Sequence, residues 1–227
     1  TFQKVKALSL EQMANSLDIQ VRLLICHTNI LGFYVQAGVF KKGLEIMSEI
    51  ESKFASAIPA INKVYANSIH YSFAVMYFAV DDYTKSLFWL NKIINDRDES
   101  RQDVLALARV VNLIIHYELG HETLAEYLVR STYRFLYKRK KLLRSEILIL
   151  EFVRKAVKTG HRDAIIDNLK FLKKELLERE KYGVPQEKKL FRYFDMVSWI
   201  ESKIENKSFA EVIVRKNKEV IRKLSRE

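Results

Sequence analysis

The feature that most constrains this chain is a helical hairpin signal that occurs five times within its 227 residues. In each case an apolar helical stretch is interrupted by a short polar tip, at residues 37–38, 80–82, 119–121, 159–161 and 206–208. Counted from positions 38, 81, 120, 160 and 207, successive tips are 43, 39, 40 and 47 residues apart. A period of roughly 40 residues is typical of helical repeat arrays. The pattern therefore predicts antiparallel helix pairs that bury their apolar faces against neighbouring pairs.

The composition supports a helical protein without membrane-spanning segments. Two prolines and six glycines are few for this length, and the long runs between them are rich in good helix formers. Because 48% of the residues are apolar, a disordered chain is excluded. The longest apolar stretch, Phe73 to Val80, is far shorter than the roughly 20 residues that a transmembrane helix needs.

Helix-end signals place the expected helices. Gly38, Gly120 and Gly160 follow apolar stretches, where a left-handed residue commonly ends a helix. Capping-box patterns start at Ser9 and Ser208. These signals predict a short helix near 2–7 and then helix pairs at 10–37/40–55, 60–80/82–95, 101–119/122–138, 142–159/162–181 and 186–205/208–224. No breaker separates two helices around 138–141, so a tight turn and one continuous helix both fit there.

Two hairpins carry aromatic and small residues at matching places. Tyr77 lies in a first helix, Tyr83 follows the tip, and Ser86 is a small residue in the second helix. The same places in the preceding hairpin are filled by Tyr34, Phe40 and Gly43. With these residues the chain resembles the tetratricopeptide repeat family, most specifically over residues 28–95, although the period is longer than the standard 34 residues and several small positions are replaced.

The resemblance implies an all-α fold, a right-handed α-α superhelix of about five antiparallel helix pairs. It further implies that residues 1–227 form a single repeat domain with a concave groove lined by the first helix of each pair. The chain begins at Thr1 rather than methionine, so we also expect it to be a fragment of a longer protein.

Catalytic and metal-binding patterns are missing from the sequence. There is one cysteine, no HxxxH motif and no glycine-rich phosphate loop or nucleophile elbow. His121 and His161 each follow a tip glycine and are expected at equivalent, solvated turn positions. His70 and His116 fall on apolar helix faces, where packing is their expected role. We therefore expect no enzyme, no metal and no cofactor.

The net charge of +11 lies wholly in the second half of the chain. Residues 1–120 are neutral, whereas residues 121–160 hold ten Lys and Arg against four Asp and Glu. The sharpest candidate site is the segment 130–144, where basic residues follow helical spacing beside tyrosines. The predicted partner-binding residues are Arg109, Arg130, Arg134, Lys138, Lys141, Arg154, Tyr133 and Tyr137. A plain solvated face explains the same spacing, and a second basic run at 215–226 is expected to be such a face.

These features favour a protein–protein interaction scaffold that binds a partner peptide or helix in its concave groove. The basic second half suggests an acidic partner segment or a terminal carboxylate. The alternative is a nucleic-acid-binding or sensory module of a transcription or signalling regulator, because arginines beside aromatic rings suit single-stranded nucleic acid. A single cysteine fits a reducing compartment, so a cytoplasmic location is expected.

Overall fold

A computed structural model describes residues 17–53, 63–96, 101–139, 142–159 and 161–224. Every regular element in these ranges is an α-helix, so the chain is all-α as predicted. The helices are α2 (Leu17–Ala37), α3 (Phe40–Lys53), α4 (Lys63–Ala79), α5 (Tyr83–Ile94), α6 (Gln102–Glu118), α7 (Glu122–Lys138), α8 (Arg144–Thr159), α9 (Arg162–Tyr182), α10 (Pro185–Tyr193), α11 (Met196–Glu205) and α12 (Phe209–Leu224). None of these helices is long and apolar enough to cross a membrane.

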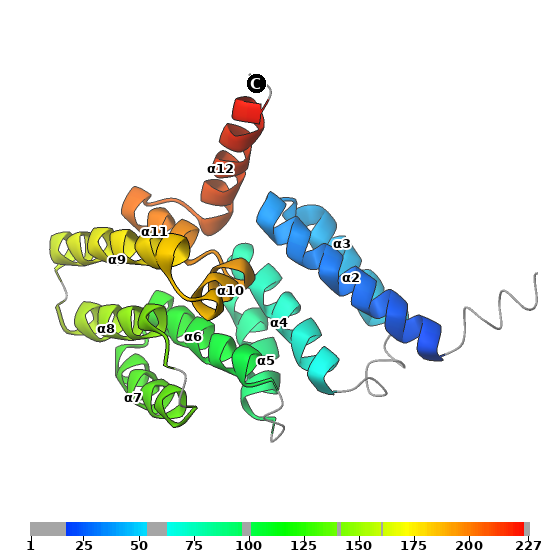
Figure 1. Ribbon diagram of the computed structural model, residues 1–227, viewed down its shortest axis with the longest axis horizontal. Helices are drawn as coiled ribbons and strands as arrows, with labels where there is room; N and C mark the ends of the chain where they lie inside the picture. The colour runs from blue at the N-terminus through cyan, green and yellow to red at the C-terminus, as the bar shows by residue number, and fades with distance from the viewer. Residues whose placement is uncertain (1–16, 54–62, 97–100, 140–141, 160, 225–227) are drawn as a thin grey trace, which may run out of the picture.

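The helices stack in chain order as antiparallel pairs (Figure 1). Each pair of neighbours from α2/α3 to α8/α9 is in contact, and the pair α11/α12 packs against α9. The first helices of successive pairs, α2, α4, α6 and α8, also contact one another along one side of the stack. This arrangement is an α-α superhelix of stacked helix pairs, with the short α10 added between the fourth and fifth pairs.

Small residues allow close helix approach at the places that the repeat resemblance marks. Ser86 of α5 is fully buried, and its hydroxyl donates a hydrogen bond of 2.8 Å to the carbonyl oxygen of Ala74 in α4. A Cβ atom added at Gly43 of α3 would lie only 2.1 Å from Cε of Met76 in α4. Helix α4 therefore leaves little room at Ser86, and at Gly43 a larger side chain would require Met76 to move.

Several predicted helix ends are confirmed. Gly38 and Gly120 have positive φ angles of 71° and 68° after α2 and α6. Ser208 and Glu211 form the reciprocal capping box, with the Ser208 amide 2.7 Å from the Glu211 carboxylate and the Glu211 amide 3.2 Å from the Ser208 hydroxyl. The other predicted end signals, Gly160 and the box at Ser9, lie outside the described residues, as does the expected helix at 2–7.

The prediction of one continuous helix over 186–205 is wrong. The backbone of Phe194 is extended, with φ −150° and ψ 122°, and it separates α10 from α11. Asp195 caps α11 by accepting hydrogen bonds from the amide and the hydroxyl of Ser198. Pro185 occupies the first turn of α10, as expected from its fixed φ angle.

The undecided boundary at 138–141 is resolved as two helices, because α7 ends at Lys138 and α8 begins at Arg144. Arg139 turns back and donates to both carboxylate oxygens of buried Glu146, at 2.7 and 2.8 Å. Burial raises the pKa of Glu146, opposed by its hydrogen bonds to the Leu143 amide and Arg139. Arg139 therefore contributes a buried ion pair rather than the surface charge that the sequence suggested.

The C-terminal helices pack back onto the N-terminal ones. Phe78 of α4 makes edge contacts with Phe194 and Phe209, with ring centroids 5.0 and 5.4 Å apart. Helix α12 contacts α2, where the side-chain amide of Asn217 donates a hydrogen bond of 2.6 Å to the carbonyl oxygen of Gln36. The first and last described helices are thus joined across the stack.

Candidate binding sites

A central cavity of about 1010 Å³ lies between the first helices of the stack and the C-terminal helices. One wall comes from α2, α4 and the start of α6, and includes Phe33, Ser72 and Arg101. The opposite wall comes from the end of α9, from α10 and from α12, and includes Tyr193 and Lys216. Its volume reaches the upper end of the range of ligand pockets, roughly 300–1,000 Å³.

The cavity combines exposed aromatic rings with scattered polar groups. Phe33 is 70% exposed and Tyr193 is 44% exposed, which is unusual for aromatic side chains on an inner surface. The guanidinium of Arg101 is held by Asp103 at 2.8 Å and donates to the Ser68 hydroxyl at 3.2 Å. The lining can therefore offer apolar contact area together with hydrogen-bonding groups in fixed positions, as peptide-binding grooves do.

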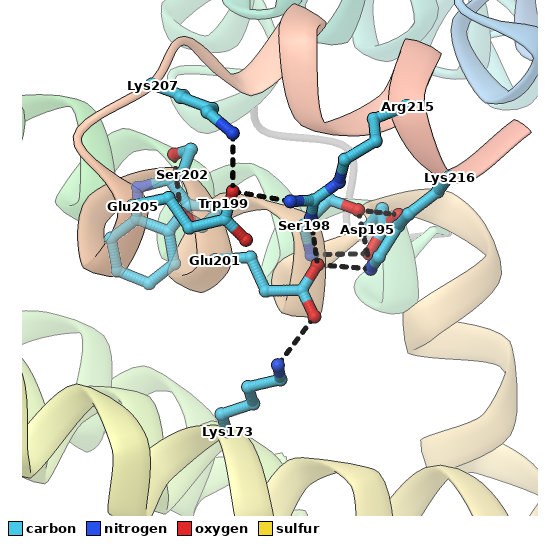
Figure 2. Close-up of polar contacts among 10 residues, drawn as sticks. All are labelled: Lys173, Asp195, Ser198, Trp199, Glu201, Ser202, Glu205, Lys207, Arg215 and Lys216. Carbon is cyan, nitrogen blue, oxygen red and sulfur yellow. Dashed lines mark hydrogen bonds and ion pairs between the residues drawn. The ribbon is translucent and has the colours of Figure 1, made fainter. Parts of the chain in front are cut away.

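A charge network supports the wall formed by α12 (Figure 2). Glu201 of α11 is nearly buried. Its carboxylate forms ion pairs with the ammonium groups of Lys173 in α9, at 2.7 Å, and Lys216 in α12, at 2.9 Å. Arg215 of α12 binds Glu205 at 2.5 Å and lies 3.7 Å from Glu201. Although burial opposes ionisation, the hydrogen bonds from Lys173 and Lys216 hold the pKa of Glu201 below its ordinary value. The network locks α9, α11 and α12 together.

The expectation that the basic run at 215–226 is a solvated face is wrong for its first two residues. Arg215 and Lys216 are partly buried and bound to the carboxylates of α11. Lys216 also donates to the Ser198 hydroxyl at 2.9 Å and lines the cavity. Spatial carboxylates, which the linear sequence does not reveal, change the role of these two cations.

A second groove of about 690 Å³ lies between α7 and α8. It brings together four of the predicted partner-binding residues, Arg130, Arg134, Tyr133 and Arg154. The floor of this groove is apolar and its rim is basic. It differs from the predicted groove, which was expected along the first helix of each pair. This α7–α8 groove shares no lining residue with the central cavity.

The other predicted partner-binding residues are not among the described residues that line this groove. Tyr137 is 66% exposed and stacks on Tyr133, with ring centroids 6.1 Å apart. Lys138 is exposed at the last turn of α7. Arg109 of α6 lies against the ring of Phe135, with its guanidinium carbon 4.6 Å from the ring centroid, and so supports α7 from beneath. Lys141 lies outside the described residues.

Sequence analysis missed the residues of the central cavity. Phe33 and Tyr193 belong to helices that are far apart in the chain, and Gln36 donates to the carbonyl oxygen of Arg192 across 156 residues. The sequence marked this place only by a glycine inside a helix, Gly32, next to Phe33. In the structure, no atom lies within 4 Å of a Cβ added at Gly32. Only the fold shows that this space is a cavity.

Two of the five histidines, His116 and His121, form a pair. The Nδ1 atoms of His116 and His121 lie 3.0 Å apart, so one ring donates to the other. His116 is therefore paired and half-buried, instead of packed in an apolar face as expected. Burial and the neighbouring His121 lower its pKa. No group of three metal-ligating side chains occurs among the residues that the structure covers.

Comparison of the chain with protein-family models, with curated proteins and with solved structures finds no match. The assignment of function therefore depends on the geometry of the two concavities.

Proposed function

We propose that this chain is a tetratricopeptide-like interaction module that binds a partner peptide or helix in its central cavity. The observation that carries the proposal is the cavity of about 1010 Å³, lined by the first helices of three successive pairs. Exposed Phe33 and Tyr193 offer contact area, and the N–H groups of Arg101 that Asp103 and Ser68 leave unused can donate to a carbonyl group. A cytoplasmic location is part of this proposal and rests on the single cysteine.

Gly32 provides a test that separates binding from folding. It lies in the middle of α2, lines the cavity, and has no neighbouring atom within 4 Å of an added Cβ. Gly32→Phe should therefore fill the cavity without a steric clash. The same change also removes a helix-interior glycine, which disfavours helices by about 1 kcal/mol relative to alanine.

The experiment selects peptides from a displayed random library on the wild-type protein and measures their binding to each variant by fluorescence anisotropy. Gly32→Phe should lose the selected peptides while its melting temperature stays at or above that of the wild type. Gly32→Ala adds only a methyl group and should retain them, and Ser48→Phe places the same ring on the exposed face of α3 as a control. Peptides that bind Gly32→Phe as well as wild type would contradict the proposal.

A further inference from the structure

Three arginines, Arg130, Arg134 and Arg154, line the α7–α8 groove. Arg139 and Arg215 are bound to carboxylates. By contrast, the exposed side chains of Arg130, Arg134 and Arg154 have no carboxylate partner among the described residues. Three unpaired cations around one groove create a local positive potential that attracts an anionic ligand.

The floor of the groove is aliphatic. Val129 and Leu150 are buried at its base, and Ile147 lies partly buried beside them. Tyr127 is 56% exposed at one end, and the stacked rings of Tyr133 and Tyr137 extend the surface toward the other. A ligand that fills this groove therefore needs an apolar group for the floor and negative charges for the rim.

We propose that the α7–α8 groove binds an acidic segment of a partner protein, in which an apolar side chain is flanked by carboxylates. The apolar side chain would rest on Val129 and Leu150, and the carboxylates would meet Arg130, Arg134 and Arg154. This site is separate from the central cavity and does not depend on the function proposed for it.

Three observations favour a peptide over single-stranded nucleic acid. Nucleic-acid grooves present free aromatic faces to successive bases, whereas Tyr133 and Tyr137 already stack on each other with an interplanar angle of 20°. The groove also holds the carboxylate of Glu151, which can accept a hydrogen bond from a peptide N–H while the carboxylates of the peptide face the arginines. A phosphate backbone has no such donor to place there. The aliphatic floor offers no hydrogen-bonding groups for reading base edges.

The length of the α7–α8 groove determines how long a test peptide must be. Tyr127 and Tyr137 are ten residues apart on one helix, a distance of about 15 Å. An extended peptide covers that distance with about five residues. Fluorescent peptides of about eight residues, with Leu, Phe or Trp between aspartates and glutamates, are therefore long enough to span the groove and carry both features.

The test compares these peptides with isosteric peptides carrying asparagine and glutamine, and with a short single-stranded oligonucleotide, by anisotropy at about 0.1 M salt. At least one acidic peptide should bind wild type, and the double variant Arg130→Glu with Arg134→Glu should weaken it by about tenfold or more. The matched control, Lys41→Glu with Lys42→Glu on exposed positions of α3, makes the same net-charge change and should alter affinity less than about twofold.

Folding of each variant is checked by its circular dichroism spectrum and melting temperature, which should match wild type because all four positions are exposed. Equal binding of acidic and neutral peptides would overturn the proposal, as would equal losses in both double variants or no binding of any acidic peptide. Selective loss of the oligonucleotide in the Arg130/Arg134 variant, without peptide binding, would assign the groove to nucleic acid instead.

Discussion

Helices α4 to α6 and helices α9 to α12 differ in the contacts that hold them together. In the first region, α4 and α6 are buried almost along their full length by apolar side chains such as Phe73, Leu107 and Ile114. In the second region, the apolar core continues through Leu172, Trp199 and Ile213. Here Lys173, Glu201 and Lys216 also join three helices through ion pairs. The comparison shows that apolar packing supports both regions and that ion pairs between helices reinforce it in the second.

Close apolar packing between α3, α4 and α5 also accounts for the small residues of the motif within residues 28–95. Apolar interlocking needs small residues at defined places, as at Gly43 and Ser86, and this leaves a motif in the sequence. Ion pairs between helices leave no fixed spacing, because long side chains reach their partners from several positions. Four predictions test this contrast, in order of the size of the expected effect.

The largest effect is expected at Phe78, where the two regions meet. Its ring is fully buried and contacts Tyr83 as well as Phe194 and Phe209 from the C-terminal region. Phe78→Ala should lower the free energy of unfolding by about 3–5 kcal/mol, because a large cavity replaces the ring. Urea unfolding followed by circular dichroism measures the change. A loss below about 1 kcal/mol would mean that the two regions do not share a core here.

The apolar region should respond to pH through His70. Burial and the nearby charge of Lys92, opposed by Asp96, lower the pKa of His70 from its ordinary value of 6.5 to about 4. Below pH 6.5 the unfolded ring gains a proton that the folded ring does not accept until about pH 4, so stability falls as pH decreases through this window. The loss should reach about 2–3 kcal/mol, since the ring is partly exposed.

His70→Phe keeps an aromatic ring beside Trp89 and removes the titration. Unfolding free energies measured for both proteins between pH 7 and pH 4 should therefore differ progressively in favour of the variant. Parallel pH curves for wild type and variant would contradict the assignment, whatever other groups contribute to the slope.

The charged region should respond to salt. Glu201→Gln leaves Lys173 and Lys216 without their shared carboxylate and should cost about 2 kcal/mol at low ionic strength, with a smaller cost at about 1 M salt. Because the pKa of folded Glu201 is lowered from 4.5, its contribution is present above pH 4.5 and is lost as pH falls through the folded value. Phe78→Ala serves as the comparison, since its cost should change little with salt.

The smallest effects distinguish two glycines of neighbouring helices. Gly43→Ala places a methyl group against Met76 and should destabilise by about 1 kcal/mol, because Met76 must move. Gly32→Ala meets open space and should stabilise by up to about 1 kcal/mol. Thermal unfolding of the two variants checks the opposite signs. The same sign for both would show that close helix approach at Gly43 has no energetic role.

The periodic features of the fold could be predicted from the sequence, and the partners of individual charges could not. The helix ends at Gly38 and Gly120 could be predicted because a residue with a positive φ angle is usually glycine. The break before Asp195 was missed, although Asp195 and Ser198 form a local capping pattern, because apolar residues continue on both sides. The role of Arg139 depends on Glu146, which lies in the next helix.

Of the two candidate sites, one could be grouped largely from the sequence and the other could not. Arg130, Tyr133 and Arg134 are neighbours on one helix, so helical spacing was enough to group them, and Arg154 joined them from α8. The central cavity needs Phe33 and Tyr193 to meet from helices at opposite ends of the described chain. Only the three-dimensional path of the chain brings such residues together.

The contact between α12 and α2 has a mechanical consequence. A superhelix whose two ends are not in contact can change its inner width by small shifts between neighbouring helix pairs. Here the Gln36–Asn217 hydrogen bond joins the two ends, and a methyl group of Val214 lies 2.9 Å from where a Cβ at Gly38 would stand. Widening the interior would therefore require the contact between α12 and α2 to separate.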